Sequence, residues 1–172
     1  MGAIARKCVR DYRRRAQERK VELIVDWEDD VEVRAESVRL REVFDNLLEN
    51  AIKYTPEGGK VEVAVHRVNG WGRARVEDTG IGFEPEMREQ IFERFERGDY
   101  EEVRDHEGSG LGLSIVQSLV EGWGGRVWAD SSGRGSGATF TVDLPRNGGR
   151  YDPTVGSPEG AAVESDSVGA RS

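Results

Sequence analysis

The sequence predicts an α+β fold, a two-layer sandwich in which helices cover one face of a mixed, mostly antiparallel sheet. Segments whose apolar residues recur at helical spacing alternate with segments whose apolar residues recur at every second position. Asn69-Gly70 joins two of the latter, and this dipeptide is typical of a hairpin turn between antiparallel strands. Interleaved helices and strands that include a hairpin favour one sheet layer under one helical layer.

The N-terminal part begins with a helix and continues into strands. Apolar residues recur at helical spacing from residue 3 to about 19, which predicts a helix with arginine-rich outer faces. Apolar and polar residues alternate over 21–27, which predicts a half-buried strand. A turn over 28–30 and a short strand at Val31–Val33 are expected to follow.

The strongest helical pattern follows. It stops at Thr55-Pro56-Glu57-Gly58-Gly59, where proline and glycine end a helix. Strands are predicted at 61–65 and 74–76, and a short helix from Pro85 through Phe92. The apolar residues on one side of the long helix are Leu40, Val43, Phe44, Leu47, Leu48, Ala51 and Ile52.

The C-terminal part is expected to close the sheet. Residues 98–106 are polar and predict a loop, and a helix is expected from about 111 to 123. Strands at 127–129 and 140–144 follow, and 147–172, rich in Gly, Ser, Asp and Glu, predicts a disordered tail. The expected organisation is therefore a helix or connector over 1–19, a folded domain over 20–146 and a tail over 147–172.

Composition narrows the class of protein. The net charge is −8 and the pI about 5.0, which disfavours a broad nucleic-acid interface. We expect Arg13-Arg14-Arg15 to be a solvated helix face. A single cysteine, Cys8, fits a reducing compartment, and no apolar run approaches the roughly 20 residues of a membrane span. A cytoplasmic domain is the default expectation.

Three polar residues share one stripe of the long helix. Asn46, Asn50 and Lys53 are spaced four and three apart, so they lie on one side, away from the apolar face. Amide oxygens suit Mg²⁺, and a lysine supplies a point charge for phosphate. The alternative interpretation is an ordinary solvated face.

Two glycine-containing loops accompany this stripe. Asp78 ends a strand and leads into Thr79-Gly80-Ile81-Gly82, where a carboxylate can accept a hydrogen bond from an adenine N6 amine and glycines admit a flat ring. Gly108-Ser109-Gly110-Leu111-Gly112-Leu113 opens a helix whose free N–H groups can bind phosphate. Arg94 and Arg97 could reach a γ-phosphate. Each loop alone could be a simple turn or hinge.

The order of these segments resembles the catalytic ATP-binding domain of sensor histidine kinases, which has the Bergerat fold of the superfamily that includes DNA gyrase, heat-shock chaperones and MutL. Asn46–Thr55 is similar to the N box, Asp78–Gly82 to the G1 box and Phe92–Arg97 to the F box. Gly108–Leu113 is similar to the G2 box and Gly135–Phe140 to the last glycine box. The resemblance covers about residues 3–145.

The resemblance implies roles for individual residues. Asn50 would coordinate Mg²⁺, and Asn46 would support the phosphates or metal-bound water. Lys53 and Arg97 would touch phosphate oxygens. Asp78 would hold adenine N6, with Thr139 near it through water. The other residues implied in ATP binding are Tyr54, Gly80, Ile81, Gly82, Gly108, Ser109, Gly110, Leu111, Gly112 and Leu113, with 96–107 as an ATP lid.

Two departures shape the expected function. Hydrolytic members of the superfamily carry a glutamate base at the Asn46 position, and an asparagine cannot activate water, which favours phosphoryl transfer. The acceptor histidine of the family lies on a separate dimerisation hairpin, and neither His66 nor His106 fits its pattern.

The expected function is that of the catalytic part of a protein histidine kinase in a two-component system. It would act with ATP and Mg²⁺ on the dimerisation and histidine phosphotransfer domain, with a response regulator downstream, and would be a monomer when isolated. The alternatives are a serine kinase of the anti-sigma-factor type and a non-catalytic ATP-sensing module.

Overall fold

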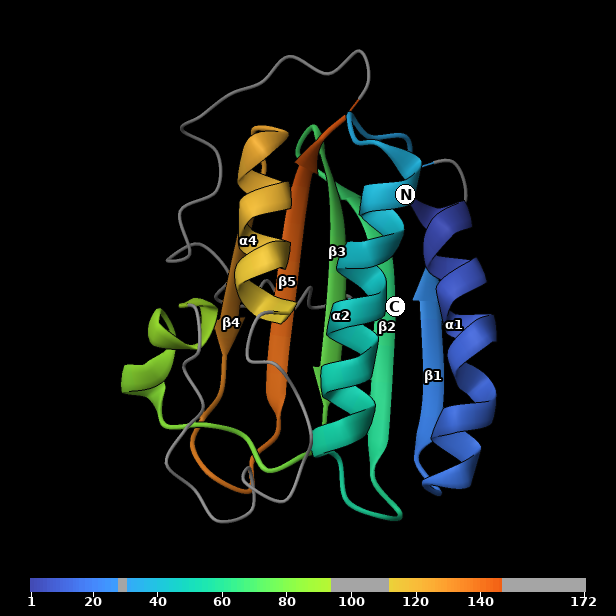
Figure 1. The fold of residues 1–172 in the computed structure, drawn as a ribbon, viewed down its shortest axis with the longest axis vertical. Helices are drawn as coiled ribbons and strands as arrows, with labels where there is room; N and C mark the ends of the chain where they lie inside the picture. Colours follow the sequence, from blue (N-terminus) through green and yellow to red (C-terminus); the bar gives the residue numbers. More distant parts are fainter. Residues whose placement is uncertain (28–30, 94–111, 147–172) are drawn as a thin grey trace, which may run out of the picture.

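The computed structural model describes residues 1–27, 31–93 and 112–146, and within them a five-stranded sheet lies under three helices (Figure 1). The strand order is β1-β2-β3-β5-β4, with β1 parallel to β2 and all other pairs antiparallel. The helices α1, α2 and α4 lie side by side on one face of the sheet (Figure 1). The predicted two-layer α+β fold is confirmed.

The elements agree closely with the predicted periodicities. The helices are α1 (Gly2–Glu18), α2 (Ser37–Tyr54) and α4 (Gly112–Gly122). The strands are β1 (Glu22–Trp27), β2 (Lys60–Val68), β3 (Trp71–Asp78), β4 (Arg126–Asp130) and β5 (Ala138–Pro145). Asn69 and Gly70 have φ of 46° and 84°, the left-handed conformation that a tight hairpin turn needs.

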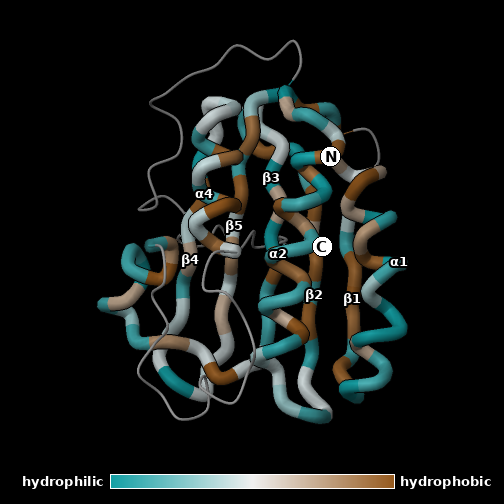
Figure 2. Tube along the Cα trace, in the orientation of Figure 1, coloured by the Kyte–Doolittle hydropathy of each residue, from teal (hydrophilic) through white to brown (hydrophobic). Residues whose placement is uncertain are grey.

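The core lies between the helices and the sheet. All seven predicted apolar positions of α2 are buried, and they pack over alternating strand residues such as Val61, Val63 and Val65. Figure 2 shows the hydrophobic stretches along β1 and β2 behind the mixed hydrophobic and hydrophilic helices. Helix α1 contributes Ala5, Cys8, Val9 and Ala16 to this same core, so residues 1–19 pack as part of the domain, although their role as a connector stays a prediction.

Two sequence-based predictions of elements were wrong. Val31–Val33 forms only an isolated bridge from Val33 to Arg146, and its two valines alternate because both pack against the bare backbone of Gly72. The segment from Pro85 to Phe92 forms two short 3₁₀ turns, η1 (Pro85–Met87) and η2 (Gln90–Phe92). Phe92 is the buried side chain of these turns, and Met87 and Ile91 pack against the core partly buried.

The other face of the sheet carries polar side chains and a buried acid. Asp143 on β5 is fully buried, and both its oxygens accept hydrogen bonds from arginines. Arg73 donates from β3 and Arg126 from β4, and the two guanidinium groups stack on Trp128 at 5.3 and 5.2 Å. This cluster joins the three strands from the side opposite the helices.

Among the described residues, no helix has the length and hydropathy to cross a membrane. The predicted disordered tail, 147–172, and the predicted loop, 98–106, lie outside the residues that the structure describes.

Candidate functional site

Asp78, the last residue of β3, is a buried carboxylate that is only half satisfied. Its Oδ1 accepts hydrogen bonds from the backbone N–H of Gly80 at 2.8 Å and of Ala138 at 3.2 Å. No described residue donates a hydrogen bond to Oδ2. Burial raises the pKa of Asp78 to about 6, although the two backbone N–H groups act in the opposite direction. The second oxygen is therefore available for a donor from a ligand.

Two glycines let the backbone close tightly around this carboxylate. A Cβ on Gly80 would overlap the carbonyl oxygen of Tyr54, and a Cβ on Gly137 would overlap the carbonyl oxygen of Asp78. Gly137 also has a φ of 72°, which side chains rarely adopt. Its N–H donates to the carbonyl of Gly80 at 3.0 Å. The Asp78 loop and the last glycine loop are thus locked together.

Ser131 fastens the same loops and was not among the predicted site residues. Its buried Oγ accepts from the N–H of Phe83 at 3.1 Å and lies 2.8 Å from the carbonyl oxygen of Gly137. A Cβ on Gly82, whose φ is 61°, would meet this same hydroxyl. A lone serine after a strand has no sequence signal that separates it from an ordinary loop residue, which is why the motifs did not reveal it.

The C-terminus of α2 connects the polar stripe with the Asp78 loop. Pro56 favours an extended conformation of Thr55, which has a ψ of 124°, so the helix ends at Tyr54. The last carbonyl groups of a helix lack partners within it. The carbonyl of Tyr54 accepts a hydrogen bond from the N–H of Ile81 at 3.1 Å. The helix end is therefore tied to the loop that follows Asp78.

The stripe of α2 faces the beginning of α4. Asn46, Asn50 and Lys53 are all half-buried. The Nδ2 of Asn46 donates to the carbonyl of Glu42 at 2.8 Å, so its Oδ1 is left as an acceptor. A Cβ on Gly112 would lie 2.6 Å from that Oδ1, which shows how closely the first residue of α4 approaches. The Nζ of Lys53 lies 4.8 Å from the centre of the Tyr54 ring.

An aromatic cluster supports the site from the strand side. Phe92 lies edge-on to Phe140 at 6.3 Å between ring centres, and Phe83 lies 6.5 Å from Phe140. All three rings are buried. Phe92 belongs to the predicted F box, Phe140 to the last glycine box and Phe83 follows the Asp78 loop, so three distant segments meet here.

The structure separates one predicted residue from this group. Ala138, which donates to Asp78, pairs with it across β3 and β5, whereas Thr139 pairs with Glu77. Successive strand residues point to opposite faces of a sheet, so Thr139 faces away from the helices and from Asp78. Thr139 was expected near adenine N6 through water, and its place on the opposite face of the sheet disfavours this role, which stays a prediction. Gly112 and Leu113 lie at the start of α4, as predicted, whereas Arg94, Arg97, the lid 96–107 and Gly108, Ser109, Gly110 and Leu111 lie outside the described residues.

The donor set of the stripe fits a hard cation that is shared with a phosphate ligand. Asn50 has a half-buried amide without a described partner, and Asn46 presents its Oδ1. Mg²⁺ accepts one or two protein oxygens and takes the rest from phosphates and water. Within the described parts of the chain no three His, Cys, Asp or Glu side chains cluster as a metal site, so a cage made by such residues alone is not found there.

These features define a class: a two-layer α+β domain whose helical layer and sheet hold a half-satisfied carboxylate and an amide stripe at one site. Residues 35–148 match the family described as histidine kinase-, DNA gyrase B- and HSP90-like ATPase. The chain belongs to this family, and the sequence-based recognition of a catalytic ATP-binding domain of the sensor histidine kinase type is confirmed.

Named relatives agree with this family. The chain is 43% identical over 114 residues to the adaptive-response sensory kinase SasA of Trichormus variabilis, a match that covers 66% of this chain and 28% of that protein. It is 39% identical over 132 residues to the sensor histidine kinase WalK of Bacillus subtilis, and this match covers 75% of this chain and 21% of that protein. Among solved structures, the mycobacterial sensor histidine kinase MprB superposes with a TM-score of 0.73 at 30% identity, covering 84% of this chain and 95% of that one.

The chain thus spans about a quarter of the length of the curated relatives it matches. The full-length kinase ShkA, solved with AMPPNP, is a further structural neighbour, with a TM-score of 0.72 at 32% identity over 83% of this chain and 29% of that one. The family supports ATP as the ligand of this site.

Proposed function

We propose that this domain binds Mg-ATP and transfers the γ-phosphate to a histidine on a separate dimerisation domain of the same kinase. The observation that carries the proposal is the meeting of Asn46 with the first residue of α4, on a helix whose last carbonyl is tied to the Asp78 loop. One half of this arrangement suits an adenine amine and the other suits phosphates. Phosphoryl transfer rests mainly on such positioning and on charge stabilisation.

The roles follow from the contacts. Asp78, held through Oδ1, presents Oδ2 to the exocyclic N6 amine. Asn50 holds Mg²⁺, and Lys53 neutralises phosphate charge. Bound Mg²⁺ would screen the charge of the phosphate oxygens during transfer. Arg97 and the residues from Gly108 to Leu111 are proposed phosphate contacts on the basis of the resemblance.

Asn46 directs the chemistry toward transfer. Its amide occupies the place where a general base would have to stand, and an amide has no useful proton affinity. Since its Nδ2 is already committed to Glu42, the side chain has a fixed orientation with the oxygen outward. It therefore positions a water or phosphate without activating it.

The wider setting is proposed on the same basis. The partner is a helical hairpin with the acceptor histidine, the downstream partner is a response regulator, and the location is cytoplasmic. As an isolated chain the domain is proposed to be a monomer, because the dimerisation surface belongs to the hairpin.

A transfer assay tests the proposal. The chain is mixed with γ-labelled ATP and a dimeric histidine-hairpin partner, and we expect acid-labile label on the hairpin. A hairpin whose histidine is replaced by glutamine should remain unlabelled, and an Asp78→Asn variant of this chain should label the hairpin more slowly at the same ATP concentration. Normal ATP binding without any label on the hairpin would contradict the proposal, and acid-stable label would indicate a serine kinase instead.

A further inference from the structure

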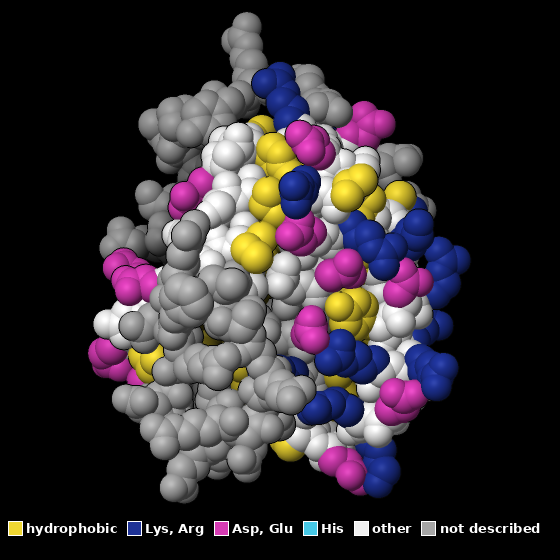
Figure 3. Space-filling model, viewed as in Figure 1, with side chains coloured by type: hydrophobic (Ala, Val, Ile, Leu, Met, Phe, Trp, Pro, Cys, Tyr) yellow, Lys and Arg dark blue, Asp and Glu magenta, His cyan; other side chains and the backbone are white. Residues whose placement is uncertain are grey.

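Helix α1 is the basic part of an acidic protein. Residues 1–20 hold eight lysines and arginines against Asp11 and Glu18, a net charge of +6. The whole chain has a net charge of −8, so residues 21–172 carry −14. Figure 3 shows the basic side chains gathered over α1, at the edge of the view. The nucleotide site lies on α2, α4 and the strand ends, and from this basic segment Arg19 donates to the carbonyl of Lys53 at 3.1 Å.

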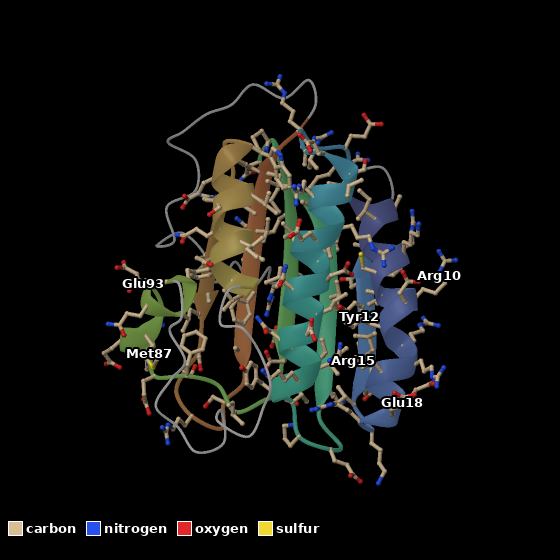
Figure 4. The ribbon with its side chains drawn as sticks, in the orientation of Figure 1. Arg10, Tyr12, Arg15, Glu18, Met87 and Glu93 are labelled. Carbon is tan, nitrogen blue, oxygen red and sulfur yellow. The ribbon has the colours of Figure 1, made fainter. Side chains whose placement is uncertain are left out.

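Part of this charge is used to hold α1 on α2. Arg15 pairs with Glu49 at 2.9 Å, and Asp11 pairs with Arg41 at 2.7 Å. The Tyr12 hydroxyl donates to the carbonyl of Asp45 at 3.2 Å. Figure 4 shows Tyr12 and Arg15 directed toward α2. These contacts explain one side of the helix only.

The opposite side carries cations that form no ion pair with any described residue. Lys7, Arg10 and Arg13 are exposed, and no described residue lies within ion-pair distance of any of them. Their spacing of three places them on one inclined row of the helix surface, which rises about 9 Å along the axis. Figure 4 shows Arg10 directed away from the body of the domain. Like charges three apart on a helix repel each other, so this outward basic stripe favours an anionic occupant.

The chain itself supplies an acidic segment that starts nearby. Pro145 accepts a hydrogen bond from the N–H of Arg34 at 2.9 Å, and Arg146 bridges to Val33. The neighbouring Val31 carbonyl accepts from the amine of Met1 at 2.6 Å, immediately before α1. Residue 146 therefore lies next to the segment that contacts the first turn of α1.

The length and charge of this segment match the stripe. The 26 residues of 147–172 can span up to about 86 Å when extended, whereas α1 with its 17 residues is about 26 Å long. Between residues 151 and 170 the segment has four acids and no base. These acids are Asp152, Glu159, Glu164 and Asp166.

We propose that the acidic segment 152–166 docks across the outward basic stripe of α1, within the same molecule. The tether raises the effective concentration of the segment at the stripe to about the millimolar range, which suits a weak and reversible ionic contact. A membrane or nucleic acid fits less well, because the −14 carried by the rest of the chain repels a large polyanion.

Spin labelling of the full chain tests this docking. Cys8 is buried and its burial raises the pKa of its thiol to about 12, so a Ser165→Cys variant is expected to react with the label at residue 165 alone. We expect the amide signals of residues 7, 10 and 13 to lose intensity in ¹⁵N spectra. They should recover when the label is reduced, and also near 1 M salt, where the Debye length is about 3 Å.

Two matched charge variants decide the assignment. Lys7→Gln, Arg10→Gln and Arg13→Gln together should abolish the loss of intensity. Arg39→Gln, Arg88→Gln and Arg134→Gln together remove the same charge from exposed arginines that pair with described acids elsewhere, and should preserve it. Equal signal loss in both triple variants, or none in the unsubstituted chain, would overturn the proposal.

A mixed sample identifies any other occupant. One chain is ¹⁵N-labelled and a second, unlabelled chain carries the spin label. Docking within the molecule predicts no loss of intensity in this sample. Loss there would assign the stripe to a second copy and would overturn the intramolecular contact. Added phosphatidylserine vesicles should leave the α1 signals unchanged, and their selective loss would assign the stripe to a membrane instead.

Discussion

Replacing Asp78 by asparagine separates what this residue does for ligand binding from what it does for stability. An asparagine keeps one oxygen that can accept from the N–H groups of Gly80 and Ala138. In place of the free oxygen, however, it presents an N–H₂ group. Two donors then face each other where adenine N6 would bind, so the ligand contact is lost while the local fold is kept.

The substitution is expected to lower ATP affinity but to raise the stability of the ligand-free domain or leave it unchanged. A hydrogen bond to a charged group contributes about 1.5–3 kcal/mol, so Asp78→Asn should weaken ATP binding roughly ten- to hundredfold. The pKa of Asp78 rises from 3.8 to about 6 because the carboxylate is buried. At neutral pH the ionised form thus costs the ligand-free fold roughly 3 kcal/mol, taken as an order of magnitude. The variant should accordingly unfold at a temperature equal to or above that of the unsubstituted domain.

Calorimetry with ATP and with inosine triphosphate, together with thermal unfolding, measures both effects. Inosine carries an oxygen in place of the N6 amine, so the variant should prefer it relative to the unsubstituted domain. Glu77→Gln is the control, because Glu77 precedes Asp78 in the strand but pairs with Arg75 on the other face of the sheet. Unchanged ATP affinity and base preference in Asp78→Asn would refute the adenine assignment.

Three further outcomes are expected. Gly137→Ala should destabilise the domain by more than the ~1–2 kcal/mol that the left-handed conformation costs, because the new Cβ would also overlap backbone, and it should reduce ATP binding. Gly135→Ala, with a φ of 76° but open space around its Cβ, should show the conformational cost alone. Equal unfolding temperatures of the two variants would contradict this expectation. Asn50→Ala should lower ATP affinity in the presence of Mg²⁺, and calorimetry should find no further loss of affinity when EDTA is added to the variant. If the variant lost equally much affinity relative to the unsubstituted domain with Mg²⁺ and with EDTA, the metal role would be excluded. As pH rises from about 4 to 6, the ligand-free domain should lose the stability that protonated Asp78 contributes, because the native state binds this proton more tightly than the unfolded chain. Over the same range the affinity for ATP should rise, because Asp78 becomes ionised. If the pH profiles of unfolding and of ATP binding ran parallel to those of Asp78→Asn, both expectations would be refuted.

Much of the fold could be predicted because its periodicities are strong. The seven apolar positions of α2 and the alternating valines of β2 are all buried, and Asn69-Gly70 makes the predicted turn. The failures have physical causes. Alternation at Val31–Val33 reflects packing on a glycine without a strand ladder, and the apolar residues between Pro85 and Phe92 are held by two separate 3₁₀ turns in place of one helix.

The candidate site was predictable where a motif fixes the residue and unpredictable where only register or packing does. The order of the boxes indicated Asp78 and the Asn46 stripe. Thr139 is a residue for which register decides, because the buried Phe140 faces the core and its strand neighbour therefore faces away from the helices. Ser131 could be recognised only from the two loop segments that it joins, the one after Asp78 and the one between β4 and β5.

Two buried carboxylates show that the hydrogen bonds made by each oxygen, and not burial alone, distinguish a ligand site from a structural ion pair. Asp143 and Asp78 lie on neighbouring strands and both are almost inaccessible. Asp143 receives hydrogen bonds at both oxygens from two arginines, so its charge is compensated within the domain. Asp78 receives two neutral amides at one oxygen and no described cation, so its burial opposes folding. A ligand that donates a hydrogen bond to Asp78 would offset the free-energy cost of burying this carboxylate, which the fold itself does not offset. The oxygen of Asp78 without a described donor indicates where that ligand donates its hydrogen bond.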